Sequence, residues 1–273
     1  MEYLKVILYG IIEGITEWLP ISSTGHLILA EKLLALPYSE EFMSMFRVVI
    51  QLGAILAVVV LYFPQLWPFT TDARHKYQRP EVWQLWFKIL VATLPAMVLG
   101  LLLDDWLDAH LYNYITVAAM LILYGVFFIL IENRRRRPTV RRMDQLTYRH
   151  ALIIGCWQVL AMIPGTSRSG ATIVGGLLLG LARPVAAEFT FFLAIPVMAG
   201  ASGLKLVKFL ADGGTFTGGE VAALALSCAV AFVVSVAAIR FLVSFVQKHN
   251  FKVFGWYRIA LGAVVLAAAF LGF

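Results

Sequence analysis

The sequence predicts an all-α integral membrane protein, folded as one membrane domain over residues 1–273. Hydrophobic residues make up 61% of the chain and charged residues only 14%, whereas soluble domains carry about 25% charged residues. Six apolar segments are long enough to cross a bilayer, since a spanning helix needs about 20 such residues. Two further hydrophobic regions are interrupted by polar stretches, and ionisable groups at membrane depth usually mark function.

The two interrupted regions, residues 3–36 and 150–183, are each predicted to form a re-entrant helical hairpin. The first breaks at Pro20 and a Ser-Ser-Thr-Gly run, the second at Pro164 and a Gly-Thr-Ser-Arg-Ser-Gly run. Proline ends the preceding helix, and Ser, Thr and Gly then start the next one. Non-helical backbone at membrane depth is tolerated where protein buries it or where it lines a wet cavity.

The remaining apolar segments are predicted to be six transmembrane helices. They cover residues 46–63, 85–103, 114–132, 189–210, 220–245 and 255–273. One hairpin and three spans therefore occur twice, in a first repeat over 1–132 and a second over 150–273, joined by a basic linker at 133–149. Pro20 aligns with Pro164, and Ser23 with Ser167. Three crossings are an odd number, so we expect an inverted-topology repeat whose hairpin tips meet near the midplane.

Loop charges predict which face of this arrangement is cytoplasmic. Basic residues gather in the loops near 64–84, 133–150 and 246–254, and aspartates in the loops between. They are Arg74, Lys76 and Arg79, then Arg134–Arg137, Arg141, Arg142 and Arg149, then Lys248 and Lys252, against Asp104, Asp105, Asp108 and Asp212. The positive-inside rule makes the basic side cytoplasmic and places both termini outside. The net charge of +6 then needs no nucleic-acid partner.

Cysteines and tryptophans are predicted to be structural. Cys156 and Cys228 lie in apolar segments without CxxC or His-rich spacing, which indicates buried thiols that form neither a disulfide nor a metal site. Trp18, Trp67, Trp83, Trp86 and Trp106 fit interfacial belts.

The first polar stretch supplies carboxylates, hydroxyls and an imidazole. Glu13 and Glu17 are four residues apart and share a helix face. They either reach water at a helix end or hold a divalent cation together with substrate phosphate oxygens. His26 suits proton transfer or attack on phosphorus, or is a hydrogen-bonded core residue. Ser22 and Ser23 are phosphate ligands, a nucleophile or helix caps, and capping is the better interpretation for each serine taken alone.

The second polar stretch places an arginine among glycines and hydroxyls. Glycines let backbone amides approach a ligand, and the amides of a helix N-terminus bind anions. The guanidinium of Arg168 matches phosphate. A buried arginine without phosphate needs a carboxylate partner, and Glu17 in the facing hairpin is the candidate. The segment is not a Walker A motif, because the Gly-Lys-Ser/Thr end is missing.

At these residues the sequence resembles the undecaprenyl-pyrophosphate phosphatase family, also called the bacitracin-resistance protein family. The family's Glu/Gln-x-x-x-Glu, Ser-Ser-x-Gly-His and Pro-Gly-x-Ser-Arg-Ser-x-x-Thr motifs read here as Glu13 to Glu17, Ser22 to His26, and Pro164 to Thr172. The resemblance implies hydrolysis of a C55 isoprenyl pyrophosphate to its monophosphate and inorganic phosphate. This reaction recycles the lipid carrier of peptidoglycan synthesis and confers bacitracin resistance.

The resemblance also implies where the protein works and which residues carry the reaction. It implies the bacterial inner membrane, a site facing the periplasm and a divalent cation, Mg²⁺ or Ca²⁺, held by Glu13 and Glu17. Glu17, His26 and Arg168 would be catalytic, with Ser23 as a candidate nucleophile. The pyrophosphate site would be completed by Glu13, Ser22, Thr24, Gly25, Gly165, Thr166, Ser167, Ser169, Gly170 and Thr172. Partners are a prenyl pyrophosphate lipid and the bilayer lipids, and a homodimer stays open.

A transporter is the competing class. Inverted repeats with midplane hairpins are transporter architecture, and fold does not fix function. The same site could bind a phosphate-bearing prenyl lipid and carry or flip it across the membrane. His26 discriminates the two, because a carrier needs anion ligands but neither a proton donor nor a nucleophile. A purely structural scaffold leaves the polar tips unexplained.

Overall fold

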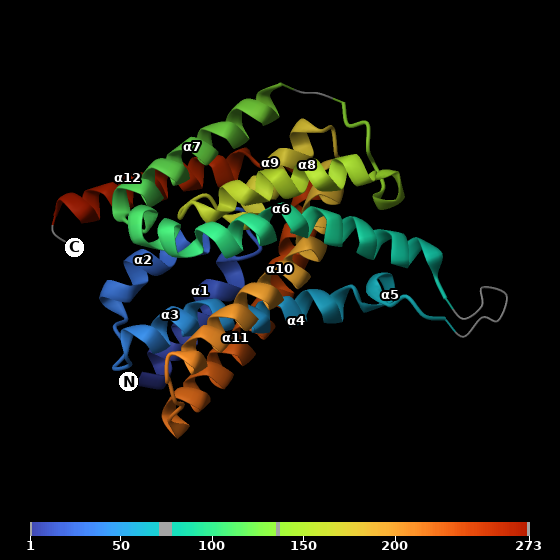
Figure 1. The fold of residues 1–273 in the computed structure, drawn as a ribbon. Helices are drawn as coiled ribbons and strands as arrows, with labels where there is room; N and C mark the ends of the chain where they lie inside the picture. The colour runs from blue at the N-terminus through green and yellow to red at the C-terminus, as the bar shows by residue number, and fades with distance from the viewer. Residues whose placement is uncertain (1, 71–77, 135–136, 272–273) are drawn as a thin grey trace.

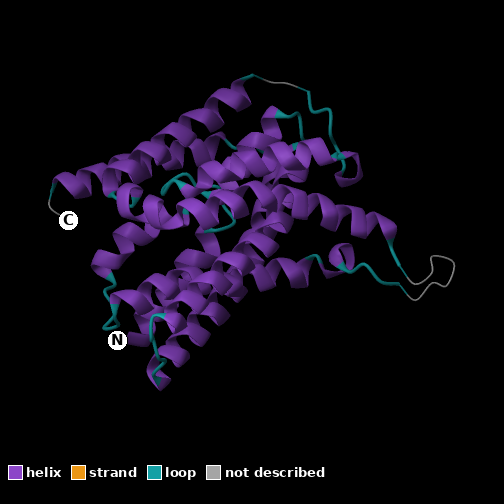
Figure 2. Cartoon of the chain, in the orientation of Figure 1, coloured by secondary structure: helices purple, strands orange, loops and turns teal. Residues whose placement is uncertain are grey.

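The computed structural model describes residues 2–70, 78–134 and 137–271 as helices joined by short loops (Figures 1 and 2). Two isolated β-bridges, Phe69 with Gln78 and Val140 with Leu181, are added to the helices. Of the predicted basic-loop residues, Arg74, Lys76, Arg135 and Arg136 lie outside the described ranges.

Six helical segments of the described chain are long and apolar enough to cross a membrane. They are α3 with α4 (Glu40–Val49 and Gln51–Leu61), the Pro80–Leu103 part of α6 (Pro80–Leu111), α7 (Tyr114–Asn133), α10 (Arg183–Ala211), α11 (Gly218–Lys248) and α12 (Lys252–Phe270). The predicted all-α integral membrane fold is thereby confirmed.

Most spans begin or end a few residues away from the predicted bounds, and the largest differences are in the first two. A single residue, Ile50, separates α3 from α4, so the first span is two coupled helices. Helix α6 continues to Leu111 because neither glycine nor proline interrupts 101–111. The aspartate-rich stretch that the sequence places in a loop is therefore helical.

Each predicted hairpin region forms two short helices around a non-helical turn. The first contains α1 (Glu2–Thr16) and α2 (Ser23–Leu33), and the second contains α8 (Tyr148–Val159), the 3₁₀ turn η3 (Leu160–Met162) and α9 (Arg168–Leu178). Helix α1 ends at Thr16, ahead of Pro20, although the Glu17 amide still donates to the Glu13 carbonyl at 3.0 Å. Entry of the two hairpins from opposite membrane faces stays a prediction.

The two turns share an unusual backbone geometry. Ser22 and Ser167 have φ of 73° and 70°, and within the described residues they are the non-glycine positions with positive φ. Each hydroxyl accepts the amide of the glycine three residues later, Gly25 at 3.3 Å and Gly170 at 3.2 Å. The geometry therefore equates Ser22 with Ser167, one residue away from the sequence alignment of Ser23 with Ser167.

The helices pack reciprocally between the two halves of the chain. Helix α1 packs on α11 and α8 packs on α6, while α7 lies against α12 (Figure 1). Gly10 and Gly155, separated by the same number of residues as Ser22 and Ser167, permit the first two contacts. A Cβ there would lie 2.7 Å from the Ser227 carbonyl oxygen and 2.3 Å from that of Ala92. The halves thus interlock rather than forming separate bodies.

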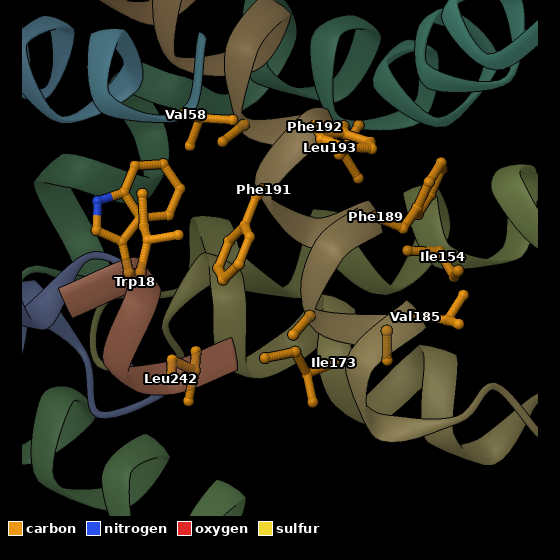
Figure 3. Close-up of a cluster of buried hydrophobic side chains, with 14 of the residues drawn as sticks. Trp18, Val58, Ile154, Ile173, Val185, Phe189, Phe191, Phe192, Leu193 and Leu242 are labelled. Carbon is orange, nitrogen blue, oxygen red and sulfur yellow. The ribbon is translucent and has the colours of Figure 1, made fainter. Parts of the chain in front are cut away.

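The main hydrophobic core includes Trp18 and Ile21 of the first turn. Trp18 is fully buried and meets Phe191 edge-on, with ring centroids 5.4 Å apart (Figure 3). The prediction of an interfacial position is therefore wrong for Trp18, because this ring anchors the turn next to Glu17. Trp67 and Trp106 are 48% and 54% exposed and Trp83 and Trp86 are half-buried, so an interfacial position for these four stays a prediction.

The cysteines differ in their burial. Cys228 on α11 is half-buried, whereas Cys156 on α8 is exposed, so the prediction of a buried thiol is wrong for Cys156. On a surface that faces lipid, a thiol behaves as a small hydrophobic group and needs no burial.

Both termini lie at one end of the helical bundle. Figure 1 shows them at the left with the α10–α11 connection, while α5 (Phe63–Leu66) and the linker from residue 137 onward lie at the right. Which end faces the outside stays a prediction from loop charge.

Candidate active site

The two turns meet at an ion pair between Glu17 and Arg168. The arginine donates from Nη2 at 3.0 Å and from Nε at 3.2 Å to Oε1 of Glu17. Its Nη1 donates to the Thr190 carbonyl at 2.9 Å. Arg168 and Glu17 side chains are 10% and 8% exposed. This is the carboxylate partner that the sequence predicts for a buried arginine, whose isolated charge would cost several kcal/mol.

Two serines complete the surroundings of Glu17. Ser23 donates from Oγ to Glu17 Oε2 at 3.2 Å, and Ser169 donates to the Glu17 carbonyl at 3.1 Å. Ser23 and Arg168 are the first residues of α2 and α9, at the same sequence separation as the two cap serines. Each hairpin thus contributes the first residue of a helix to one carboxylate.

Other predicted site hydroxyls are held in local structure. Ser22 and Ser167 cap α2 and α9. Capping, the interpretation that the sequence favours for Ser22 and for Ser23, is therefore confirmed for Ser22 and wrong for Ser23, whose hydroxyl donates to Glu17 instead. Thr172 is buried, and its Oγ1 lies 2.8 Å from Oγ1 of Thr190. Because Thr190 also accepts from Arg168, Thr172 stands behind the arginine and supports it.

The second turn is shaped by residues with little freedom. Gly165 has φ +91°, and a Cβ there would lie 2.4 Å from the Val117 carbonyl oxygen, so only glycine fits. A Cβ on Gly170 would lie 3.0 Å from Arg258 Nη1, and one on Gly25 would lie 3.0 Å from the Leu121 side chain. Thr166 is fully buried, and its hydroxyl has no partner in the described chain.

Glu13 is the residue best suited to hold a cation. Its side chain is fully buried, and neither carboxylate oxygen has a hydrogen-bond partner among the described residues. It lies one helical turn before Glu17. The described residues contain no group of three or more His, Cys, Asp or Glu side chains arranged for a metal. A divalent cation at Glu13 and Glu17 would therefore take its further ligands from water or from substrate phosphate oxygens, which is how Mg²⁺ often binds.

His26 is bonded at both ring nitrogens. Nδ1 lies 2.7 Å from the Ser22 carbonyl oxygen, and Nε2 lies 2.7 Å from the Tyr257 hydroxyl of α12. The imidazole is half-buried at the start of α2. Of the predicted site residues, Ser23, Arg168 and Ser169 thus bond directly to Glu17. His26 bonds to Ser22 and Tyr257 instead.

Arg258 of α12 joins the two turns and was not singled out from the sequence. It is fully buried and donates from Nη2 to the carbonyls of Gly165 and Thr166, both at 2.8 Å. From Nη1 it donates to the Pro20 carbonyl at 3.2 Å. Pro20 and Gly165 again have the separation of Ser22 and Ser167. The sequence does contain a sign of this role, because Arg258 lies inside the predicted span 255–273 and arginines within membrane spans are rare and usually functional.

A cavity of about 1200 Å³ reaches the site. Ser23 and Thr24 line one part of it, and Arg47, Gln51 and Lys205 line another. Small-molecule sites usually measure about 300–1,000 Å³, so this space is ample for a diphosphate group. Arg47 pairs with Glu31 at 2.5 Å. Of the residues in the two sequence motifs, Ser23 and Thr24 line the cavity.

Comparison with known proteins assigns this chain to a family. The model of the bacitracin resistance protein BacA family matches residues 6–264. The undecaprenyl-diphosphatase of Enterococcus faecalis is 57% identical over 264 residues, covering 96% of this chain and 95% of the relative. That of Desulfitobacterium hafniense is 59% identical over 269 residues, covering 97% and 95%. That of Lactococcus lactis is 53% identical and covers both chains in full. The chain belongs to the bacitracin resistance protein BacA family.

Proposed function

We propose that this protein is a membrane phosphatase that hydrolyses undecaprenyl pyrophosphate to undecaprenyl phosphate and inorganic phosphate. The observation that carries the proposal is the carboxylate of Glu17, which receives Arg168 from one hairpin and Ser23 from the other. The named relatives are undecaprenyl-diphosphatases over nearly the full length of both chains. Hydrolysis recycles the lipid carrier of peptidoglycan synthesis and supports bacitracin resistance.

The phosphate chemistry is assigned to the residues around Glu17. A divalent cation, Mg²⁺ or Ca²⁺, held by Glu13 and Glu17 would neutralise charge on the pyrophosphate oxygens. Arg168 presents its fork to the same group and exchanges Glu17 for phosphate when the substrate binds. Stabilising the charge that spreads over the transferring phosphoryl group is the main task of such a site.

Three groups are candidates for the attack on the terminal phosphorus. Ser23 Oγ already donates to Glu17, which can accept its proton as the oxygen attacks. His26 attacks through Nε2 in a second route or, in a third, takes the proton of a water molecule. Trapping a phosphorylated residue with labelled substrate separates the routes, because only the first two leave phosphate on the protein.

The orientation rests on the loop charges, and the inner-membrane location rests on the resemblance to the bacitracin-resistance family. We assign the protein to the bacterial inner membrane, with both termini and the site toward the periplasm. The prenyl tail then stays among the bilayer lipids while the pyrophosphate enters the cavity beside Ser23 and Thr24.

Phosphate release in detergent tests the function, since no second compartment exists there. The wild type should release phosphate from a prenyl pyrophosphate in the presence of Mg²⁺, and His26→Ala should lose nearly all turnover while remaining folded. His110→Ala is the matched control, because His110 Nδ1 contacts the carbonyl four residues earlier at 2.9 Å but lies exposed on α6. Substrate binding without release by the wild type would instead favour a transporter or flippase of the prenyl lipid.

A further inference from the structure

The Tyr257 hydroxyl contacts Nε2 of His26, the ring nitrogen that would take the proton in the proposed hydrolysis. The Ser22 carbonyl has no proton to give, so Nδ1 of His26 must donate in its 2.7 Å contact. In the neutral ring, the proton on Nδ1 leaves Nε2 as an acceptor. The Tyr257 hydroxyl, 2.7 Å away, therefore donates to Nε2. The two partners together select one tautomer of His26.

The charges nearby favour the neutral ring. Arg258 follows Tyr257 on α12, is fully buried, and interacts electrostatically with His26. Glu17 is already paired with Arg168. Among the described residues neither His26 nor Arg258 has a carboxylate in hydrogen-bond contact, so burial and the guanidinium both disfavour a second positive charge on the imidazole and favour its neutral form.

Tyr257 also stands at the boundary between the site and the outside of the bundle. It is 46% exposed, between Trp256 at 62% and Arg258 at 0%. The ring planes of Tyr257 and His26 are within 11° of parallel. A side chain that is half exposed has room to rotate, so the hydroxyl can leave Nε2 when a substrate arrives from the lipid side.

We propose that Tyr257 is a positioning residue, which fixes His26 in the Nδ1–H tautomer and yields Nε2 to the substrate complex. The proposal rests on the proposed phosphatase function. As the oxygen of a water molecule bonds to the terminal phosphorus, one of the water protons passes to Nε2, and the bond from phosphorus to the bridging oxygen breaks. The proton then returns from Nε2 to the phosphate products, and the Tyr257 hydroxyl bonds the neutral ring again.

The test uses Tyr257→Phe, which removes the hydroxyl and keeps the ring. The full chain in detergent, with ¹⁵N-labelled histidine, reports the tautomer by nuclear magnetic resonance, and His26→Gln assigns the signal by its loss. The wild type should show His26 protonated at Nδ1 with a hydrogen-bonded Nε2. In Tyr257→Phe the Nε2 signal should move to the chemical shift of an unprotonated imidazole nitrogen that accepts no hydrogen bond.

Kinetics complete the test. Turnover of Tyr257→Phe should fall about tenfold at unchanged KM, the effect of one lost hydrogen bond. Tyr3→Phe, an exposed tyrosine on α1, should leave both turnover and spectrum unchanged. An unaltered His26 signal or unaltered turnover in Tyr257→Phe overturns the proposal. A wild type that binds but does not hydrolyse the substrate refutes the proposed function and the catalytic part of this inference, while the spectrum still decides whether Tyr257 sets the tautomer.

Discussion

At the scale of single residues, the carboxylate of Glu13 stands out because it is buried while neither of its oxygens has a hydrogen-bond partner among the described residues. An isolated charge inside a protein costs several kcal/mol, and both Glu13 oxygens lack a partner in the described chain. A cation that binds between Glu13 and Glu17 would remove this cost. Stability and cation binding should therefore be linked at this position.

Glu13→Gln tests that link. The amide keeps the shape of the side chain and removes the charge, so Mg²⁺ should raise the melting temperature of the wild type and leave that of the variant unchanged. Phosphate release should fall by about 100-fold or more, since metal-assisted charge stabilisation is worth several kcal/mol. Thermal unfolding with EDTA and with MgCl₂ provides the measurement. Glu40→Gln, an exposed carboxylate at the cavity, is the control, and an Mg²⁺ response retained in Glu13→Gln would refute the site.

Arg168→Lys tests the planar fork. Lysine cannot reach Glu17 Oε1 with two donors and the Thr190 carbonyl with a third. Loss of one charged hydrogen bond, worth about 1.5–3 kcal/mol, should lower kcat by about 10- to 100-fold in the phosphate-release assay. Arg142→Lys is the matched control, because the Arg142–Asp144 pair is solvent-exposed at 71% and 62% and such pairs contribute little. Near-normal turnover of Arg168→Lys would show that Arg168 serves only as the structural ion-pair partner of Glu17.

Residue-level prediction succeeded where polar residues cluster and failed where they stand alone. The Glu17–Arg168 pair and the Ser22 cap follow from charge burial and capping rules that need no coordinates, whereas Ser23, expected to cap, donates to Glu17. Arg258 and Tyr257 lie in a stretch that reads as an ordinary membrane span. Their partners are a backbone carbonyl, a turn and an imidazole far away in sequence, and such contacts exist only once the helices have packed.

At the scale of elements, the second turn depends on one glycine. Gly165→Ala would place a Cβ in a left-handed conformation and 2.4 Å from the Val117 carbonyl oxygen. The backbone cost and the overlap together should exceed about 2 kcal/mol and lower the melting temperature by about 5 °C. Gly200→Ala is the matched control, because a Cβ at Gly200 on α10 would meet nothing within 4 Å. A Gly165→Ala protein as stable and active as Gly200→Ala would contradict the geometry of the turn.

Element boundaries were the weaker part of the sequence prediction. Proline located both turns, yet α1 ends at Thr16 and α8 at Val159, because the turns include residues before the prolines. The break at Ile50 has no glycine or proline to announce it. Hydrophobic length fixes where a span exists, but the packing of neighbouring helices decides where the backbone bends.

At the scale of the whole molecule, loop charge makes a prediction about orientation that labelling can check. The two native cysteines are first removed by Cys156→Ser and Cys228→Ala. A single cysteine is then introduced at an exposed position, either Thr215→Cys between α10 and α11 or Arg141→Cys in the basic linker. A membrane-impermeant maleimide should modify Thr215→Cys in intact cells and Arg141→Cys only after permeabilisation. The reverse pattern would invert the assigned orientation and place the site toward the cytoplasm.

The number of spans, the two interrupted regions and the helical class could all be predicted because a bilayer imposes length and composition on every segment. The way the halves interlock could not, since α1 packs on α11 and α8 on α6 through contacts between distant parts of the chain. The pairing of Gly10 with the Ser227 carbonyl is visible only in three dimensions.

The guanidinium of Arg258 imposes a mechanical condition on catalysis. Since one rigid planar group bonds the Pro20 carbonyl of one turn and the Gly165 carbonyl of the other, neither turn can shift without straining its bonds to the other. Any displacement of the carboxylate-bearing turn would then carry the arginine-bearing turn with it, so that the two would move as a single part against the surrounding helices.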